Sequence, residues 1–129
     1  MRQKILVVDD SKTYLVFATH ALESAGFSVF QSEDIWISRL LESHRPHLIL
    51  MDVNLGVMQG TNAVKALKRH KFCEGAKFFL HSSETAESLE ELTADCGADG
   101  YITKDGQAET LVLKVQQALA SSSTAGLFS

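Results

Sequence analysis

The sequence predicts an α/β protein built on a parallel sheet of five strands. Short apolar runs alternate five times with helical patterns along the 129 residues. Strands are expected near residues 4–8, 28–32, 48–52, 77–81 and 100–103, and helices near 12–25, 34–44, 60–70, 85–96 and 107–120. Because such a βα alternation places helices on both faces of a parallel sheet, we expect a doubly wound fold.

The composition of each strand predicts its place in the sheet. Strands that are buried on both faces are continuously apolar, as are residues 5–8, 48–51 and 78–80. Residues 28–31 and 101–103 mix polar and apolar side chains, which is typical of edge strands. The predicted order is therefore 2-1-3-4-5, the order of flavodoxin-like (βα)5 folds.

Length and composition predict one domain over residues 1–120, with a flexible tail or the start of a linker at 121–129. A net charge of −4 disfavours nucleic acid as a direct partner. Apolar runs are too short for a membrane span or a signal peptide. Cys73 and Cys96 lack a C-x-x-C spacing, which fits reduced thiols in a cytoplasmic protein and disfavours a zinc site.

Charged side chains stand where three of the strands end. Asp9 and Asp10 follow the first strand, Asp52 ends the third and Lys104 follows the fifth. The carboxyl ends of parallel strands line one edge of the sheet, where such folds bind ligands. Three carboxylates at one edge repel one another unless a cation joins them. The sequence therefore predicts a metal-assisted acidic site with a lysine beside it.

Asp52 is the candidate nucleophile of this site, because a carboxylate can attack phosphorus and form an aspartyl phosphate. Such a transfer needs a divalent cation, and hard oxygen ligands favour Mg²⁺. Asp10 and Asp52 would bind the ion directly, Asp9 directly or through water, and Asn54 through its backbone carbonyl. Lys104 would pair with one phosphoryl oxygen, and Ser82 at the end of the fourth strand would donate a hydrogen bond to another.

These residues resemble a known family. The segments that carry the resemblance are Val8-Asp9-Asp10, Met51-Asp52, Ser82-Ser83 and the stretch 97–104. Together they resemble the receiver domain of bacterial two-component response regulators, over roughly residues 4–120. The resemblance implies a regulatory domain that takes a phosphoryl group from a phosphohistidine on a sensor histidine kinase or a histidine phosphotransfer protein. It also implies a downstream output protein or a missing output domain.

The resemblance also implies roles for single residues. Asp52 is the phosphoacceptor, Asp9 and Asp10 are the metal pair, Ser82 is the switch hydroxyl, Lys104 binds phosphate and Tyr101 is the aromatic switch. In that scheme Ser82 moves toward the phosphoryl group and Tyr101 turns inward, which remodels the face formed by the fourth helix, the fifth strand and the fifth helix. Some members of the family also form homodimers upon phosphorylation.

Five residues bear on how closely the chain follows the family. Asp105 stands where a proline usually follows the lysine, and Leu55-Gly56 replaces a common Met-Pro pair. Gly56 could loosen the loop that carries the Asn54 carbonyl. Asn54 and Glu84 occupy the two positions that tune dephosphorylation, and the pair resembles that of chemotaxis-type regulators, which predicts a short-lived phosphoryl state.

The first helix and the fourth helix suggest partner surfaces. Residues 14–17 are all large and apolar and span about 300° of the helix, so at least one of them must be exposed near the acidic edge. Scattered surface hydrophobicity and a docking face for the phosphodonor, with Tyr14 or Phe17 as contacts, both fit this pattern. The fourth helix is strongly acidic, which fits a solvated face or a basic output partner.

Three other functions remain as alternatives. A pseudo-receiver would keep the fold and bind partners without phosphate, and the changes at Asp105 and Leu55-Gly56 favour it. A Mg²⁺-dependent phosphatase with an aspartyl nucleophile would want an acid where Asn54 stands. A nucleotide-binding oxidoreductase would need a glycine fingerprint in place of residues 9–12.

Overall fold

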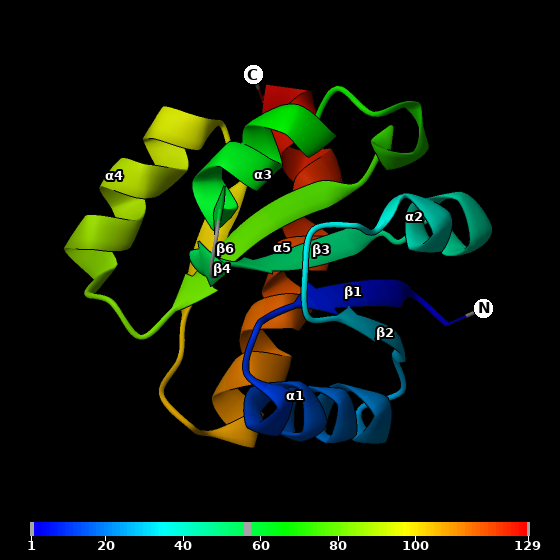
Figure 1. Ribbon diagram of the computed structural model, residues 1–129, viewed down its shortest axis with the longest axis vertical. Helices are drawn as coiled ribbons and strands as arrows, with labels where there is room; N and C mark the ends of the chain where they lie inside the picture. The colour runs from blue at the N-terminus through cyan, green and yellow to red at the C-terminus, as the bar shows by residue number, and fades with distance from the viewer. Residues whose placement is uncertain (1, 56–57, 129) are drawn as a thin grey trace.

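A computed structural model, which describes residues 2–55 and 58–128, has the predicted architecture (Figure 1). Its main sheet consists of five parallel strands, namely β1 (Lys4–Val8), β2 (Ser28–Ser32), β3 (Leu48–Asp52), β6 (Lys77–Ser82) and β7 (Gly100–Thr103). Their order is β2-β1-β3-β6-β7. Once the two short strands β4 (Asn54–Leu55) and β5 (Met58–Gln59) are set aside, this is the expected 2-1-3-4-5 order.

Helices cover both faces of this sheet, as a doubly wound fold requires (Figure 1). They are α1 (Lys12–Ser24), α2 (Ser38–His44), α3 (Gly60–Leu67), α4 (Ala86–Cys96) and α5 (Ala108–Phe128). Helices α1 and α5 pack on one face, and α2, α3 and α4 pack on the other. No helix in the described residues is both long and apolar enough to span a membrane.

Two apolar cores, one on each face, explain why the central strands are continuously apolar. In β3, Ile49 and Met51 pack with α2, α3 and α4, whereas Leu48 and Leu50 pack with α1 and α5. All five residues of β3 are buried. Alternating side chains of a strand point to opposite faces, so a strand covered on both sides needs an apolar residue at every position.

Two helices differ from their expected limits because local side-chain hydrogen bonds set their ends. Helix α2 begins at Ser38 rather than near residue 34, since Asp34 Oδ1 accepts a hydrogen bond from the Trp36 backbone N–H and holds a turn there. Helix α3 ends at Leu67, and a 3₁₀ turn, η1 (Lys71–Cys73), follows. The His70 ring accepts from the Phe72 N–H at the start of that turn.

Helix α5 continues to Phe128, whereas its sequence predicted an end near residue 120. The segment 121–129 contains four serines and no proline, so every residue in it has the backbone N–H that a helix uses. The helical backbone at 121–128 therefore corrects the expected boundary, while the role of these residues as a tail or linker stays a prediction.

A small antiparallel hairpin between β3 and α3 was not predicted. It pairs β4 (Asn54–Leu55) with β5 (Met58–Gln59). The Gly60 N–H closes it against the main sheet by donating to the Val53 carbonyl at 2.7 Å. Gly56, at which the loop was expected to loosen, lies outside the described residues.

Candidate functional site

The three predicted aspartates lie together at the carboxyl edge of the sheet. Val8 of β1 pairs with Met51 of β3, which places the next residues of the two strands side by side. Asp9, Asp10 and Asp52 each offer a carboxylate oxygen, and these oxygens lie within 4.8 Å of one another. Asp9 and Asp52 are buried, and Asp10 is exposed. The cluster is therefore anchored by two buried carboxylates and open to solvent through the third.

Backbone hydrogen bonds fix Asp9 at the start of α1. Its N–H donates to the Ser32 carbonyl of β2 at 3.0 Å, and its Oδ1 accepts from the Ser11 N–H at 2.8 Å. Ser11 is the N-cap of α1 and accepts from the Tyr14 N–H. Because Oδ1 is used in this turn, Oδ2 of Asp9 points to the site.

Lys104 reaches both buried carboxylates. Its backbone N–H donates to the Ser82 carbonyl at 2.8 Å, which ties the end of β7 to the end of β6. Its Nζ lies 2.6 Å from Asp9 Oδ2 and 3.6 Å from Asp52 Oδ1. Asp105 in place of proline therefore does not prevent the lysine from reaching the acidic cluster.

Burial and Lys104 have opposite effects on the ionisation of Asp52. Burial raises the pKa of Asp52 to about 6, and the positive charge of Lys104 opposes that rise. The negative charges of Asp9 and Asp10 raise the pKa further. A carboxyl group with such a pKa is one whose negative charge lacks full compensation. An additional cation at this cluster would supply that compensation.

Two other predicted residues, Ser82 and Asn54, lie at the same edge of the sheet as Asp52. Ser82 is buried at the end of β6, one residue beyond His81, which pairs with Asp52; its Oγ accepts from the Glu84 N–H at 3.2 Å. The Asn54 N–H donates to Asp52 Oδ1 at 3.4 Å. The structure thus brings Ser82 and Asn54 to the edge that carries Asp52.

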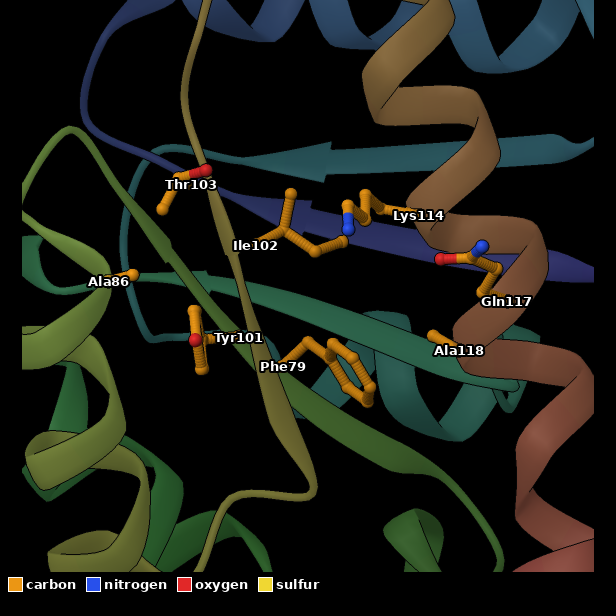
Figure 2. Close-up of a pocket in the computed structure, with 8 residues that line it drawn as sticks. All are labelled: Phe79, Ala86, Tyr101, Ile102, Thr103, Lys114, Gln117 and Ala118. Carbon is orange, nitrogen blue, oxygen red and sulfur yellow. The ribbon is translucent and has the colours of Figure 1, made fainter.

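Tyr101 lies apart from the cluster. Figure 2 shows it on the α4 side of β7, whereas Ile102 lies on the α5 side. Its hydroxyl donates to Glu90 Oε1 of α4 at 3.0 Å. The ring lines a cavity of about 480 Å³ between α4, β7 and α5, together with Phe79, Ala86 and Lys114 among others. Tyr101 in this structure is therefore directed outward.

The acidic cluster fits Mg²⁺. Its donors are carboxylate oxygens, which this hard cation prefers, and two of them are presented by backbone that the sheet holds in place. Exposed Asp10 leaves one side open to water, and Mg²⁺ commonly retains several waters in protein sites. The raised pKa of Asp52 agrees with this fit, because a bound cation would stabilise the ionised carboxylate.

Two aromatic residues that were not predicted, His81 and Tyr14, pack behind the site. His81 is fully buried, with Nε2 3.7 Å from Asp9 Oδ2. Its ring lies 5.2 Å from that of Tyr14, and the Tyr14 ring lies under Lys104 Nζ. Side chains alternate along a strand, so His81 of β6 points to the opposite face from Ser82. The direction of a side chain from the first turn of α1 has no comparable signal in the sequence.

Burial of His81 predicts a specific acid sensitivity. Burial, followed by the charge of Lys104, lowers the pKa of His81 to about 4, so the folded protein holds the ring neutral. Between the unfolded pKa near 6.5 and about 4, only the unfolded chain takes up this proton, so stability falls as the pH falls through that window.

When the pH falls from about 7 to about 4.5, we expect the wild type to lose about 2 kcal/mol more unfolding free energy than His81→Leu. Urea unfolding at the two pH values measures this difference, and His20→Leu at an exposed position of α1 is the matched control. Equal acid sensitivity in the wild type and His81→Leu would contradict a neutral buried imidazole.

Comparison with known proteins agrees with this fold and site. The family model of the response regulator receiver domain matches residues 5–116. The chain belongs to the response regulator receiver domain family. Such domains serve phosphorylation-based signalling in two-component systems rather than acting as classical enzymes, and they generally bind Mg²⁺ at an acidic pocket. They interact with histidine kinases and output domains.

Individual relatives fall into two lengths. The chain is 29% identical over 126 residues to the alkaline phosphatase synthesis transcriptional regulatory protein PhoP of Bacillus subtilis, covering 97% of this chain and 52% of PhoP. It is 25% identical to the chemotaxis protein CheY of Halobacterium salinarum over 94% of this chain and 100% of CheY. The crystallised CheY4 of Vibrio cholerae superposes with a TM-score of 0.82 at 28% identity, covering 92% of this chain and 99% of CheY4. The chain therefore spans about half of PhoP and nearly all of the CheY proteins.

Proposed function

We propose that this chain is a phosphorylation-dependent switch that accepts a phosphoryl group on Asp52. The observation that carries the proposal is the position of Lys104 Nζ, 2.6 Å from Asp9 and 3.6 Å from Asp52, in a cluster of three carboxylates. This arrangement supports a site at one sheet edge in which Asp52 is the nucleophile, Asp9 and Asp10 bind the metal ion and Lys104 pairs with the phosphoryl group. The chain would act in the cytoplasm, and the donor would be a sensor histidine kinase or a histidine phosphotransfer protein.

In the proposed reaction an Asp52 carboxylate oxygen attacks the phosphorus of the phosphohistidine. The new O–P bond forms as the P–N bond breaks, and the imidazole leaves with the electron pair. Asp9, Asp10, Asp52 and the Asn54 carbonyl would hold Mg²⁺, which offsets negative charge on the nucleophile and the phosphoryl oxygens. Lys104 pairs with a phosphoryl oxygen and orients the group. Water later hydrolyses the acyl phosphate and restores the Asp52 carboxylate.

The signal would leave the site through Ser82 and Tyr101. Ser82 Oγ accepts a 3.2 Å hydrogen bond from the Glu84 N–H, which leaves its own O–H proton to donate toward a new phosphoryl oxygen. Such a turn would draw in the segment before α4. Tyr101 would then leave Glu90 and turn inward, which changes the α4–β7–α5 face and its cavity (Figure 2). That face would bind the output partner or, on phosphorylation, a second copy of the chain.

The phosphoryl state is proposed to be short-lived. Asn54 lies at the site and is exposed, and Glu84 is placed two residues beyond Ser82. Glu84 Oε1 accepts from the Ser88 hydroxyl at 2.8 Å, which holds it at the start of α4. Both side chains are polar, so neither would exclude the attacking water by apolar cover. A phosphoryl lifetime of many hours would contradict this part of the proposal.

Docking of the phosphodonor is expected at Val16 rather than at Tyr14 or Phe17. The prediction that one of residues 14–17 is exposed is confirmed, because Val16 is 68% exposed while Leu15 is buried. Tyr14 and Phe17 are half-buried, and the Tyr14 ring packs beneath Lys104, so Val16 is the more accessible contact. Val16 also lines a hollow of about 340 Å³ beside Ser32 at the end of β2.

We expect Val16→Gln to slow phosphotransfer from the cognate phosphohistidine protein about tenfold, because about 1.4 kcal/mol of apolar contact is lost. Phosphorylation by acetyl phosphate should be unchanged, since Val16 faces solvent and offers no group to the reaction. Leu113→Gln, at a 51% exposed position of α5, is the matched control. Equal losses with both phosphodonors would count against a docking role.

Beryllium fluoride, a mimic of the phosphoryl group, tests the proposed state. In ¹⁹F NMR, the wild type with Mg²⁺ should show a bound beryllium fluoride signal that is lost with Asp52→Asn or with a chelator. Absence of a bound signal in the wild type would favour a pseudo-receiver that binds its partners without phosphate.

A further inference from the structure

Lys104 is held by anions on one side and by an aromatic ring on the other. Its Nζ lies 4.2 Å from the centroid of the Tyr14 ring, within the range of a cation–π contact. On its other side lie the Asp9 and Asp52 carboxylates described above. Tyr14 comes from the first turn of α1 and Lys104 from the end of β7, so the contact joins two elements that are distant in the sequence.

Core packing holds the Tyr14 ring in place. Its centroid lies 5.2 Å from the His81 ring and 5.7 Å from the Phe17 ring, in tilted geometries. His81 is fully buried and belongs to the central part of the sheet. Burial, and after it the charge of Asp9, raises the pKa of the Tyr14 phenol, so the ring stays neutral. The ring is thus a fixed, uncharged platform for the ammonium group.

The chain around Lys104 does not fix the side chain by itself. Asp105 and Gly106 follow, and Gly106 has a φ of 78°, a conformation that glycine adopts readily. The hydrogen bond from Lys104 N–H to Ser82 fixes the backbone alone. A lysine stem has several rotatable bonds, so the position of Nζ depends on what the ammonium contacts.

The proposed reaction takes both anionic contacts away from Lys104. Asp9 would turn to the cation, and Asp52 would carry the phosphoryl group. The Tyr14 ring takes part in neither event, so its contact can persist from the free protein to the phosphorylated one. We propose that Tyr14 is a positioning residue for Lys104, whose ring holds the ammonium beside Asp52 while the carboxylates change partners. This inference rests on the proposed function.

Two substitutions distinguish an effect of the aromatic face of Tyr14 from an effect of its apolar volume. Tyr14→Phe keeps the aromatic face, and Tyr14→Leu keeps an apolar side chain without it. With acetyl phosphate and saturating Mg²⁺, we expect Tyr14→Phe to be phosphorylated within about twofold of the wild-type rate. Tyr14→Leu should be about three- to tenfold slower. In a Lys104→Gln background, Tyr14→Leu should have no further effect, because the group it positions is absent.

NMR of the Lys104 side chain gives a readout that does not depend on phosphorylation. The Lys104 Hε protons should carry an upfield ring-current shift in the wild type and Tyr14→Phe, and lose it in Tyr14→Leu. Absence of that shift in the wild type would overturn the contact itself. Thermal unfolding of each variant shows whether the fold is retained.

The outcomes distinguish this inference from the proposed function. A wild type that accepts no phosphoryl group would overturn the proposed function and this inference with it. A phosphorylated wild type with an equally fast Tyr14→Leu variant would overturn the role of Tyr14 alone. If Tyr14→Leu lowers the phosphorylation rate equally in the Lys104→Gln background, its effect does not act through Lys104. That result would also overturn the positioning role of Tyr14.

Discussion

Replacing Gly60 by alanine is expected to cost about 3 kcal/mol or more of unfolding free energy and to disturb Asp52 directly. A Cβ at Gly60 would lie 1.9 Å from the Asp52 carbonyl oxygen and 2.8 Å from the carbonyl carbon. Both atoms belong to the backbone, so no side-chain rotation relieves the clash. The hairpin between β3 and α3 would have to move away from the residue that carries the proposed phosphoryl group.

Urea unfolding measures this loss, and Gly75→Ala is the control. Gly75 has a φ of 83° and nothing within 4 Å of its would-be Cβ, so alanine there meets backbone strain without a clash. We expect about 1 kcal/mol for Gly75→Ala. Gly60→Ala should also lower the extent of phosphorylation under conditions that keep it folded. Equal stability losses at the two glycines would contradict the close approach of α3 to Asp52.

Lys104→Gln is expected to slow phosphorylation by acetyl phosphate by about 100-fold or more. The lysine is the cation that the structure places against both Asp9 and Asp52, so its removal takes away charge compensation for the incoming phosphoryl group. The pKa of Asp52 should rise further, because Lys104 now lowers it. Mg²⁺ should bind at least as tightly as in the wild type, since the lysine no longer competes for Asp9.

Stopped reactions followed by intact mass give the rate, and Lys114→Gln on α5 is the matched control for loss of one exposed positive charge. Lys104→Arg keeps the charge with a larger planar group and should recover part of the rate at most. A Lys104→Gln variant with the wild-type rate and weaker Mg²⁺ binding would contradict the assignment of Lys104 to the phosphoryl group.

Strand positions and the carboxyl-edge cluster could be predicted from the sequence because each rests on a local signal. Apolar continuity marks β3 as central, and Asp52 is the charged residue that ends it. Parallel pairing then places Asp9 and Asp10 beside it without further information. The same reasoning put Ser82 and Lys104 at the edge, where the Lys104 N–H meets the Ser82 carbonyl.

Features that depend on side-chain direction or on a single hydrogen bond could not be predicted in this way. The start of α2 depends on which backbone group the Asp34 carboxylate accepts from. The β4–β5 hairpin has two residues in each strand, too few for a periodic pattern. Among residues 14–17, the sequence required one exposed side chain but did not say that Val16 faces solvent and Tyr14 faces Lys104.

The central claim is that Asp52 accepts a phosphoryl group with the help of a divalent cation, and intact mass tests it most directly. The purified wild type would be incubated with acetyl phosphate in the presence of Mg²⁺, in its absence, and beside Asp52→Asn. We expect the mass of one phosphoryl group on the wild type, dependent on Mg²⁺ and absent from Asp52→Asn, and its removal by hydroxylamine as for an acyl phosphate. A wild type that gains no mass, or an Asp52→Asn variant that gains the same mass, would contradict the claim.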